Sequence, residues 1–598
     1  MPSPLLAVQY DLFATPAQTL SDGRLTARAI AEAVTNDDER LALARAFCEQ
    51  AVAAYWSTIP GASGLRQSFR GYLVARLTFQ AQSLAADLGK AARGLTTETA
   101  FYELGRLYNT MLPPTFRARL GVYYTPPELV ERLLDQATAA GVDWLTCRVL
   151  DPACGGGAFL APVARRMLTG LRTYDQAMAL SSLAVRLQGF EIDPFAAWLS
   201  QVALDAVVIE TLGGEDSSLP DCIQVCDALV RPDPAAEQCH DLVIGNPPYG
   251  RLGLDAEQRM RFRRSLYGHA NLYGIFTDLA LRHARAGGIV AYVTPTSFLA
   301  GHYFKELRHL LAQEAPPVSL DFVDARKGVF DDVLQETLLA VYRKDGTASE
   351  AMAVTVSRGA DGCLRVNRAG RFRLPSDPSE PWLVPRNAAQ AELLATATAM
   401  PARLRHWGYS VSTGPLVWNR HKPQLAAERC AACLPLIWAE AVSSDGRFQF
   451  RAAKRNHLPW LRIRDRRDHW LIIKDPCVLV QRTTAKEQAR RLIAAELPRA
   501  FLAEHGGAVV ENHLNMVRPD GPTPPVSAST VTAFLGSRAV DALFRCINGS
   551  VAVSAFELEA LPLPEPGALH RLEALVRDQA GRDEIDAECA RLYQMEQL

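Results

Sequence analysis

Short apolar segments alternate with stretches of helical composition between residues 121 and 345, and this alternation limits the fold more than any other feature of the chain. Strands that are separated by helices pair side by side in parallel, and the helices cover the two faces of the sheet. The sequence therefore predicts an α/β domain with a mostly parallel, doubly wound sheet. The predicted strands are residues 148–150, 187–191, 242–244, 289–293, 319–323 and 337–342.

The rest of the chain predicts further domains, since 598 residues are too many for one hydrophobic core. Apolar residues at helical spacing indicate a helical domain over residues 1–120, before the α/β domain of 121–345. The polar, glycine-rich and proline-rich residues 346–399 are typical of a junction. Residues 400–565 mix short strands and loops, and residues 566–598 have the amphipathic pattern of a helical segment.

A glycine-rich turn follows the first predicted strand, where Asp151 leads into three glycines, Gly155 to Gly157. Glycines let the backbone turn sharply and approach a ligand, and the N–H groups at the start of the following helix suit a carboxylate or a phosphate. Many folds use such a turn only to change direction. The turn has neither the phosphate-binding GxxxxGK[ST] pattern nor a clean GxGxxG pattern.

Two further strand ends carry acidic residues, Glu191 after the second strand and Asp227 after another short apolar stretch. Glu191 can accept hydrogen bonds from ribose hydroxyls, Ile192 can lie against a purine ring, and Asp227 can accept from an exocyclic amine. Each acid alone is more often a solvated loop residue. Together with Asp151 they favour a nucleoside site, because open α/β sheets bind ligands beyond the carboxyl ends of their strands.

The segment Asn246-Pro-Pro-Tyr249 follows the predicted strand at 242–244 and can continue neither a strand nor a helix. Its prolines fix the backbone and remove two N–H donors, so the Asn246 amide and the Pro247 carbonyl offer acceptors. Rigid acceptors beside the Tyr249 ring suit an NH2 group on a flat base. An ordinary Pro-Pro turn is the alternative.

These segments together resemble a known family. DPACGGGAF, FEID, CDAL and NPPY, in this order, resemble S-adenosylmethionine-dependent amino-methyltransferases, and LGVYYTPPELVERLL resembles the extra N-terminal motif of gamma-type adenine-N6 DNA methyltransferases. Residues 400–565 look more loosely like the target-recognition domain of type II and type IIG modification enzymes. The resemblance implies a Rossmann-like methyltransferase domain with a helical N-terminal region and a C-terminal recognition domain.

The resemblance also implies roles for individual residues on the cofactor side. Thr125 and the turn at 151–157 would hold the methionine end of S-adenosylmethionine, Glu191 the ribose, and Ile192 and Asp227 the adenine. The gap of about forty residues between Asp151 and Glu191 is longer than is typical, and it indicates a helical insertion at 165–185. The cofactor-binding residues expected are Thr125, Asp151, Ala153, Gly155, Gly157, Glu191, Ile192 and Asp227.

On the substrate side, Asn246 and Pro247 would accept hydrogen bonds from the target amine and Tyr249 would stack on the target base. The segment KGVFDDVLQETLLAVY nominates Phe330 as a second aromatic residue on the other side of the base. A base inside a duplex cannot reach such a pocket, so it must be flipped out. The four residues are expected to be catalytic, and no metal is needed for the transfer.

Basic residues are concentrated in one part of the chain although the formal net charge is only −1. Residues 401–500 contain nineteen Lys and Arg against eight Asp and Glu, with arginines interleaved with aromatic residues at 447–470. Such a block suits duplex DNA, mainly through phosphates, and a solvated basic face is the alternative. The DNA-binding residues expected are Arg420, Lys422, Arg451, Lys454, Arg455, Arg462 and Arg464.

Other classes of protein and site are disfavoured. The twelve cysteines are scattered rather than framed for disulfides, which is typical of a reducing cytoplasm, and Cys430-x-x-Cys433 lacks the second pair that a zinc site needs. No apolar run indicates a membrane partner. None of the eight lysines has Asp or Glu two positions earlier, so a fused nuclease is not expected.

The sequence thus predicts a cytoplasmic, nucleoid-associated DNA adenine-N6 methyltransferase, acting alone or beside a separate restriction nuclease or defence subunits. A methyltransferase for RNA or for a glutamine amide, and a DNA-binding specificity subunit without catalysis, are the alternatives.

Overall fold

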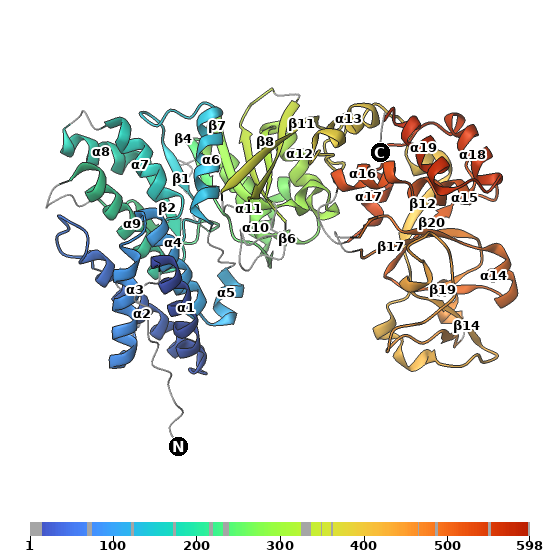
Figure 1. The fold of residues 1–598 in the computed structure, drawn as a ribbon, viewed down its shortest axis with the longest axis horizontal. Helices are drawn as coiled ribbons and strands as arrows, with labels where there is room; N and C mark the ends of the chain where they lie inside the picture. The colour runs from blue at the N-terminus through green and yellow to red at the C-terminus, as the bar shows by residue number, and fades with distance from the viewer. Residues whose placement is uncertain are drawn as a thin grey trace, which may run out of the picture.

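A computed structural model describes most of the chain, and Figure 1 shows the N-terminal helices at one end, the C-terminal part at the other and the central sheet between them. The described residues form twelve segments of the chain. They are 15–67, 74–120, 125–171, 175–213, 219–230, 238–323, 336–347, 350–359, 363–464, 466–484, 488–547 and 552–595.

A nine-stranded sheet forms the centre of the molecule, in the order β11-β10-β8-β9-β7-β4-β1-β2-β3. The pairs β3·β2, β2·β1, β1·β4, β4·β7 and β8·β10 are parallel, and β9 runs antiparallel to β7 and β8. The predicted α/β fold and all six predicted strands are confirmed. The strands are β1 Val149–Asp151, β2 Leu187–Glu191, β3 Ile223–Val225, β4 His240–Gly245, β7 Ala284–Pro295, β8 Pro317–Val323, β9 Thr337–Arg343, β10 Glu350–Arg358 and β11 Leu364–Arg373.

The strand order reverses beside β1. The chain passes from β1 to β2 and β3 on one side and then returns to place β4 on the other, with Leu150 opposite Val243 in parallel register. The loops after β1 and β4 therefore leave the sheet in opposite directions, and such a switch point leaves a crevice in which ligands bind.

Alternating side chains of the central strands enter two separate cores. Val149 belongs to the core beneath α7 and α9, whereas Leu150 packs in the core with α11 and α12. The predicted insertion at 165–185 is helical, as the end of α7 and most of α8 occupy it. The flanking helices are α6 Pro127–Ala139, α7 Leu160–Leu171, α8 Gln176–Arg186, α9 Pro194–Leu212, α11 Leu272–His283 and α12 Lys305–Glu314.

Helix α9 is long and apolar enough to cross a membrane, yet 83% of its apolar window is buried inside this protein. It packs against α7 and β3 as a core helix.

The N-terminal helices continue the core beneath α9 and are not a separate body. Buried residues such as Phe47, Tyr55 and Leu104 belong to the same cluster as Trp198 of α9. The predicted helical content of residues 1–120 is present, while the predicted domain boundaries stay predictions. The helices are α1 Pro16–Glu32, α2 Asp37–Trp56, α3 Phe79–Ala92, α4 Thr97–Met111 and α5 Pro114–Leu120.

The stretch predicted as a junction is different in the structure, because residues 346–399 contain β10, β11 and helix α13, Ala388–Ala397. Strand β10 pairs with β8 and buries Ala351, Ala353 and Val356, which extends the sheet. Gly359 and Pro375 flank the strands of this hairpin, whereas Gly370 lies inside β11 with φ +142°. The mostly apolar run at residues 351–356 was the signal that the prediction overlooked.

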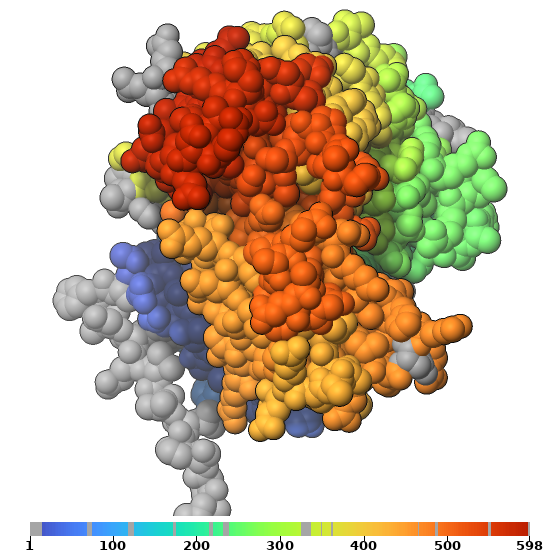
Figure 2. Space-filling model, turned by 90° about the vertical axis from the view of Figure 1, so that its right-hand side faces the viewer, coloured from blue at the N-terminus to red at the C-terminus, as the bar shows by residue number. Residues whose placement is uncertain are grey.

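The C-terminal part contains a four-stranded sheet, β12-β20-β17-β18, and a five-stranded sheet, β13-β15-β14-β19-β16, and it covers most of the face seen in Figure 2. Its helices pack around the four-stranded sheet (Figure 1). The strands are β12 Tyr409–Thr413, β13 Leu425–Ala426, β14 Cys433–Ile437, β15 Trp460–Arg462, β16 Ile472–Ile473, β17 Cys477–Gln481, β18 Ala494–Leu497, β19 Ala508–Val510 and β20 Leu514–Pro519, and the helices are α14 Arg499–His505, α15 Ala528–Leu535, α16 Arg538–Ile547, α17 Ala555–Glu559, α18 His570–Arg577 and α19 Arg582–Leu592.

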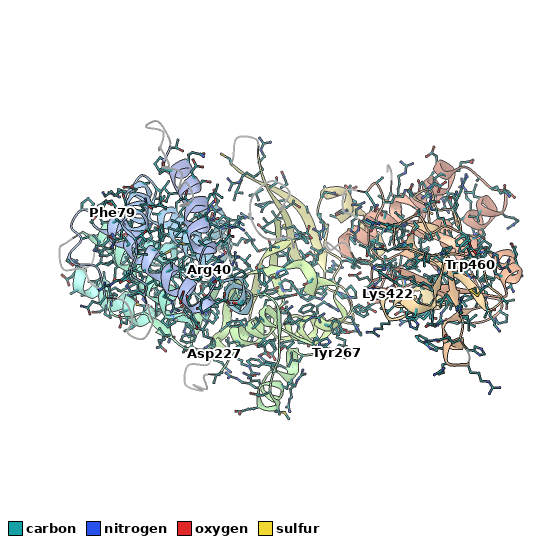
Figure 3. The ribbon with its side chains drawn as sticks, turned by 90° about the horizontal axis from the view of Figure 1, so that it is seen from below. Arg40, Phe79, Asp227, Tyr267, Lys422 and Trp460 are labelled. Atoms are coloured by element: carbon teal, nitrogen blue, oxygen red, sulfur yellow. A yellow bond between two sulfur atoms is a disulfide. The ribbon has the colours of Figure 1, made fainter. Side chains whose placement is uncertain are left out.

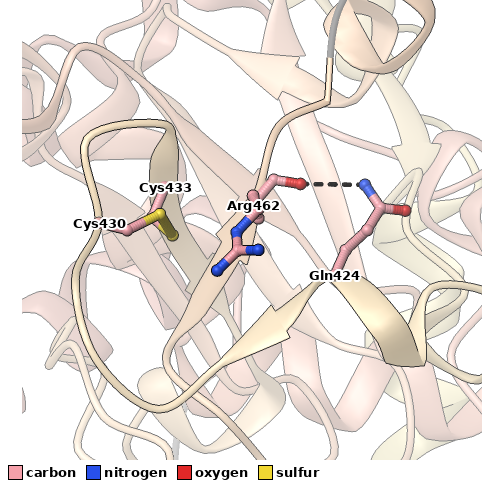
Figure 4. Close-up of a disulfide and its surroundings, with 4 residues drawn as sticks. All are labelled: Gln424, Cys430, Cys433 and Arg462. Carbon is pink, nitrogen blue, oxygen red and sulfur yellow. Dashed lines mark hydrogen bonds between the residues drawn. A yellow bond between two sulfur atoms is a disulfide. The ribbon is translucent and has the colours of Figure 1, made fainter.

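One expectation about cysteines is wrong. Cys430 and Cys433 form a disulfide at the start of β14, beside the strand that carries Arg462 (Figure 4). The Cys433 N–H donates to the Cys430 carbonyl at 3.0 Å, so the turn between them brings the two side chains together. The prediction used the spacing of all twelve cysteines, and this spacing does not reveal a local turn between two of them.

Candidate active site

A cavity of about 470 Å³ lies at the carboxyl ends of β1, β2, β3 and β4, on the edge where the strand order reverses. Its lining includes seven of the residues that the sequence nominated, from five segments far apart in the chain. They are Thr125, Ala153, Gly155, Glu191, Ile192, Asp227 and Asn246. Asp227 is labelled in Figure 3, on the underside of the central part.

The other nominated residues differ in position. Asp151, Gly157, Pro247 and Tyr249 belong to the same loops without lining the cavity wall. Phe330 lies outside the described residues.

The glycines of the turn have different roles. Gly155 has φ +52° and open space where a side chain would stand, so the absence of a side chain leaves this space to the cavity. Gly157 has φ +85°, and a Cβ there would stand 2.8 Å from Ser200 Oγ on α9. Gly157 thus lets the turn pack on the core helix, and Gly155 serves the cavity.

Asp151 links the glycine turn to the loop after β4. It is 1% exposed, its Oδ1 accepts from the Ala153 N–H at 3.0 Å, and a Cβ at Gly245 would stand 2.6 Å from that oxygen. Its Oδ2 has no hydrogen-bond partner among the described residues. Burial raises the pKa of Asp151 to about 8, so a cation beside it would be needed to stabilise the charged form.

Glu191 holds the turns around the cavity together. Its two carboxylate oxygens accept from the Gly155 N–H at 2.9 Å and from the Asp193 N–H at 2.8 Å. Burial raises the pKa of Glu191 to about 7 despite these bonds. The next residue, Ile192, is 50% exposed, an apolar surface beside the acid that a flat ring could cover.

The N-terminal helices supply a wall of the cavity that the sequence reading missed. Arg45 of α2 and Tyr108 of α4 both reach Asp193, at 3.0 Å to Oδ1 and 2.7 Å to Oδ2. Asp193 caps α9 by accepting from the Phe195 N–H, so the two helices hold the turn that carries Glu191 and Ile192. A buried arginine amid the apolar run of α2 was the signal that could have found this wall. Leu112 and Phe116 also line it.

The Asn246 amide has a defined orientation. Its Nδ2 donates to Thr125 Oγ1 at 3.1 Å, and its Oδ1 accepts from the Tyr249 hydroxyl at 2.6 Å. That hydroxyl is also 3.2 Å from the Val293 carbonyl, and the Tyr249 ring meets Tyr273 edge to face. Thr125 therefore fixes which atom of the amide is the acceptor.

The basic residues nominated in the C-terminal part are exposed and lie outside the cavity. Arg464 pairs with Asp468 at 3.2 Å, Arg451 donates to the Glu440 carbonyl, and Lys422 Nζ lies 5.3 Å above the Trp418 ring. Lys454 and Arg455 are on the loop before β15, Arg462 is on β15, and Arg420 is beside Trp418. The structure gathers them in one part of the molecule but not around one point, and their exposure suits a flat polyanion.

Among the described residues, no group of three or more His, Cys, Asp or Glu side chains could hold a metal ion.

Comparison with known proteins shows what the chain is similar to. Residues 215–330, which include Asn246 to Tyr249, match the Eco57I restriction-modification methylase family. The chain is 25% identical over 487 residues to the type II methyltransferase M.PstI of Providencia stuartii, covering 76% of this chain and 89% of that protein. It is 27% identical over 365 residues to M.BsuBI of Bacillus subtilis, covering 58% and 70%.

A solved structure has the same fold over nearly the whole chain. The type IIL restriction-modification enzyme MmeI, solved in complex with DNA, aligns with a TM-score of 0.54 at 12% identity, over 98% of this chain and 96% of that one. The resemblance to restriction-modification methylases that the motifs predicted is confirmed by these matches.

Proposed function

We propose that this chain, whose residues 215–330 match the Eco57I restriction-modification methylase family, transfers a methyl group from S-adenosylmethionine to the N6 amine of an adenine flipped out of duplex DNA. The observation that carries the proposal is the single cavity in which the glycine turn, Glu191, Asp227 and Asn246 meet. A methyl donor and its acceptor must share one enclosed space, because transfer occurs in a single displacement.

The residues present fit S-adenosylmethionine. The buried Asp151 Oδ2 suits the ammonium of the methionine end, and the open space at Gly155 leaves room for a ligand against the backbone. Ile192 and Asp227 would hold the adenine by contact with its face and by accepting from its amine, and Glu191 would meet the ribose. When bound, S-adenosylmethionine supplies an electrophilic methyl group on a positively charged sulfur.

Asn246 and Pro247 would activate the acceptor. The lone pair of an adenine amine is delocalised into the ring, and acceptors at both N–H groups favour a pyramidal nitrogen whose lone pair points at the methyl group. The nitrogen would take the methyl group as an N–C bond replaces the C–S bond, which would leave a neutral thioether, and it would lose its proton to water. The contribution is positional and electrostatic.

The Tyr249 hydroxyl and the target amine would compete for Asn246 Oδ1. In the structure the hydroxyl holds that oxygen at 2.6 Å. A base amine would displace the hydroxyl, and the freed Tyr249 ring would then stack on the base. Phe330 remains the proposed second aromatic contact.

We also propose a DNA-binding region, a cellular location and partners for this chain. Duplex DNA would lie along the exposed cations of the C-terminal part, which would act as the recognition region. The enzyme would work in the cytoplasm on the nucleoid, with a separate nuclease or defence subunits as possible partners. Methylation of RNA or of a protein amide is the competing function.

The test is transfer of tritiated methyl groups from S-adenosylmethionine to genomic DNA, total RNA and a glutamine-containing peptide, followed by nucleoside analysis. We expect N6-methyldeoxyadenosine from the DNA arm alone. Label in N4-methylcytosine would reject the adenine assignment, and label confined to RNA or peptide would reject DNA as the substrate.

A further inference from the structure

An exposed group of aromatic and basic side chains lies beside the candidate active site and has no role in the function proposed above. It consists of Tyr267, His269, His302, Tyr303 and Lys305, here called the aromatic rim. Tyr267 and Tyr303 are 36% and 50% exposed. Tyr267 contacts His302 at 4.9 Å between ring centroids, His269 contacts Tyr303 at 5.4 Å, and Lys305 Nζ lies 3.8 Å above the Tyr267 ring.

The loop that carries Tyr267 and His269 follows directly after the Asn246–Tyr249 segment. Strand β5, Arg251–Leu252, begins two residues after Tyr249 and pairs with β6, Ala270–Asn271. The Leu272 N–H donates to the Gly250 carbonyl at 2.9 Å, which closes the base of the excursion. Tyr267 and His269 therefore stand on a loop, with α10 Ala256–Arg261, whose two ends are tied to the Asn-Pro-Pro-Tyr segment.

The rim is held rigidly. Asp278 of α11 is fully buried and accepts from Arg264 Nε at 2.8 Å and from Ser265 Oγ at 2.9 Å, just before Tyr267. Gly268 has φ +68°, and a Cβ there would stand 3.0 Å from the Tyr303 ring. The turn is thus fitted against Tyr303, and aromatic faces held in place in the free protein lose little entropy when they bind a ligand.

A line of aromatic contacts joins the rim to the base-binding residues. The Tyr249 ring meets Tyr273 at 6.1 Å, and Tyr273 stacks on Phe304 at 5.1 Å, the residue between Tyr303 and Lys305. Two side chains, Tyr273 and Phe304, therefore connect Tyr249 to the segment that carries Tyr303 and Lys305.

The charge of the rim suits a nucleic acid strand. Residues 258–271 contain four arginines and no acidic residue, and two of them, Arg259 and Arg263, are exposed. Burial, Lys305 and Arg308 lower the pKa of His302, which favours the neutral form of a ring that is suited to stacking. In Figure 3, Tyr267 lies along the long axis between Asp227 of the cavity and Lys422 of the C-terminal part.

We propose that the aromatic rim binds the DNA next to the extruded base, with Tyr267 and Tyr303 stacking on a base that extrusion leaves unstacked and Lys305 meeting a phosphate. This inference rests on the proposed function and deepens it. Aromatic faces accept any base, and a lysine pairs with phosphate regardless of sequence, so the rim would stabilise opened DNA without reading its sequence. Sequence would be read elsewhere.

The first test uses the unaltered chain. A pool of random-sequence duplexes carrying 5-iodo-2′-deoxyuridine is irradiated with the protein and S-adenosylhomocysteine, and the crosslinked peptides are identified by mass spectrometry. We expect crosslinks in peptides with Tyr267 or Tyr303 in addition to the C-terminal part. Crosslinks confined to residues 400–565 would overturn the rim, while leaving the proposed function intact.

The second test compares variants. Tyr267→Ala with Tyr303→Ala is expected to weaken binding of duplex DNA about tenfold and to leave S-adenosylmethionine affinity within about twofold. The matched control is Phe79→Ala, an aromatic residue 83% exposed at the other end of the molecule (Figure 3). Equal DNA affinity of the two variants rejects the rim, and a wild-type chain that binds no DNA rejects both proposals.

Lys305→Gln tests the phosphate contact separately, because loss of one such contact should lower the slope of log affinity against log salt by about 1. The matched control Lys90→Gln changes an exposed lysine on α3. An unchanged slope for Lys305→Gln would reject its phosphate contact.

Discussion

The loops around the cavity and the exposed cations of the C-terminal part are built in different ways. Asp151, Glu191, Asp227 and Asn246 stand at or just beyond the ends of neighbouring strands, so the register of one sheet brings them together. The basic residues stand on loops and short strands of a small sheet, where several separate pairings set their positions. The activity of a site formed at a sheet edge depends on a few atoms, whereas the DNA affinity of a charged surface depends on the sum of many weak contacts.

The strongest test of this contrast is removal of one atom group in the cavity. Asn246→Ala should lower kcat by about a thousandfold or more, because it removes an acceptor used in the transition state, and should leave S-adenosylmethionine affinity unchanged. Single-turnover methyl transfer and calorimetry measure the two effects. A loss within about tenfold, roughly 1.4 kcal/mol of barrier, would contradict the role of this residue.

The control for that experiment is Asn367→Ala, which changes an exposed asparagine on β11. It should retain full activity. Because Asn246 Nδ2 also donates to Thr125, a variant Thr125→Val should lower kcat less than Asn246→Ala does, since it leaves the acceptor oxygen in place.

The second test concerns the wall from the N-terminal helices. Arg45→Met removes a cation that binds Asp193, and Tyr108→Phe removes the second donor to the same carboxylate. We expect each to weaken S-adenosylmethionine binding about tenfold through the turn that carries Glu191 and Ile192, with DNA affinity unchanged. A rise in KM for the methyl donor with unaltered kcat would show positioning of the ligand.

Arg28→Met is the matched control, because Arg28 is an exposed arginine on α1 that pairs with Glu32. Arg45→Lys should restore part of the affinity, since it keeps the charge. If Arg45→Met lowers thermal stability and leaves the KM for the methyl donor unchanged, Arg45 is only structural.

The third test concerns the charged surface, where each residue should matter little. Lys454→Gln with Arg455→Gln should weaken duplex DNA binding about fivefold at fixed salt and reduce the salt slope by about 2, because each contact releases about one counterion. Fluorescence anisotropy across a salt series measures this. A loss of methyl transfer as large as that of Asn246→Ala would mean that single residues of the charged surface matter as much as those of the cavity. An unchanged slope of log affinity against log salt would mean that Lys454 and Arg455 do not contact phosphates.

The same contrast explains how much could be predicted from the sequence. The six strands and the restriction-modification resemblance are confirmed, because apolar runs and the motifs after them are local signals. The roles of Thr125, Glu191, Asn246 and the other nominated residues stay predictions, although the structure brings seven of them to one cavity.

What the sequence could not supply depends on contacts between distant residues. Arg45 and Tyr108 meet Asp193 only because the N-terminal helices share a core with α9, and helical periodicity carries no information about that pairing. The rim likewise needs residues 267–269 and 302–305 to fold against each other. Strands β10 and β11 were missed for a different reason, since the glycines and prolines around them outweighed the short, mostly apolar run at residues 351–356.

The fourth test concerns pH and separates the buried cavity from the exposed surface. Burial raises the pKa of Asp151 to about 8, above the usual value of about 4 for an unfolded chain. Between these values the folded protein binds more protons than the unfolded one, so the free energy of unfolding should fall as pH rises from about 4 to about 8. Asp151→Asn should flatten this dependence in thermal melts, whereas Asp520→Asn, at an exposed position, should not.

Since a ligand ammonium favours the ionised carboxyl, S-adenosylhomocysteine should stabilise the wild-type protein more at pH 8 than at pH 6. Equal stabilisation at both pH values would mean that Asp151 does not meet the ammonium.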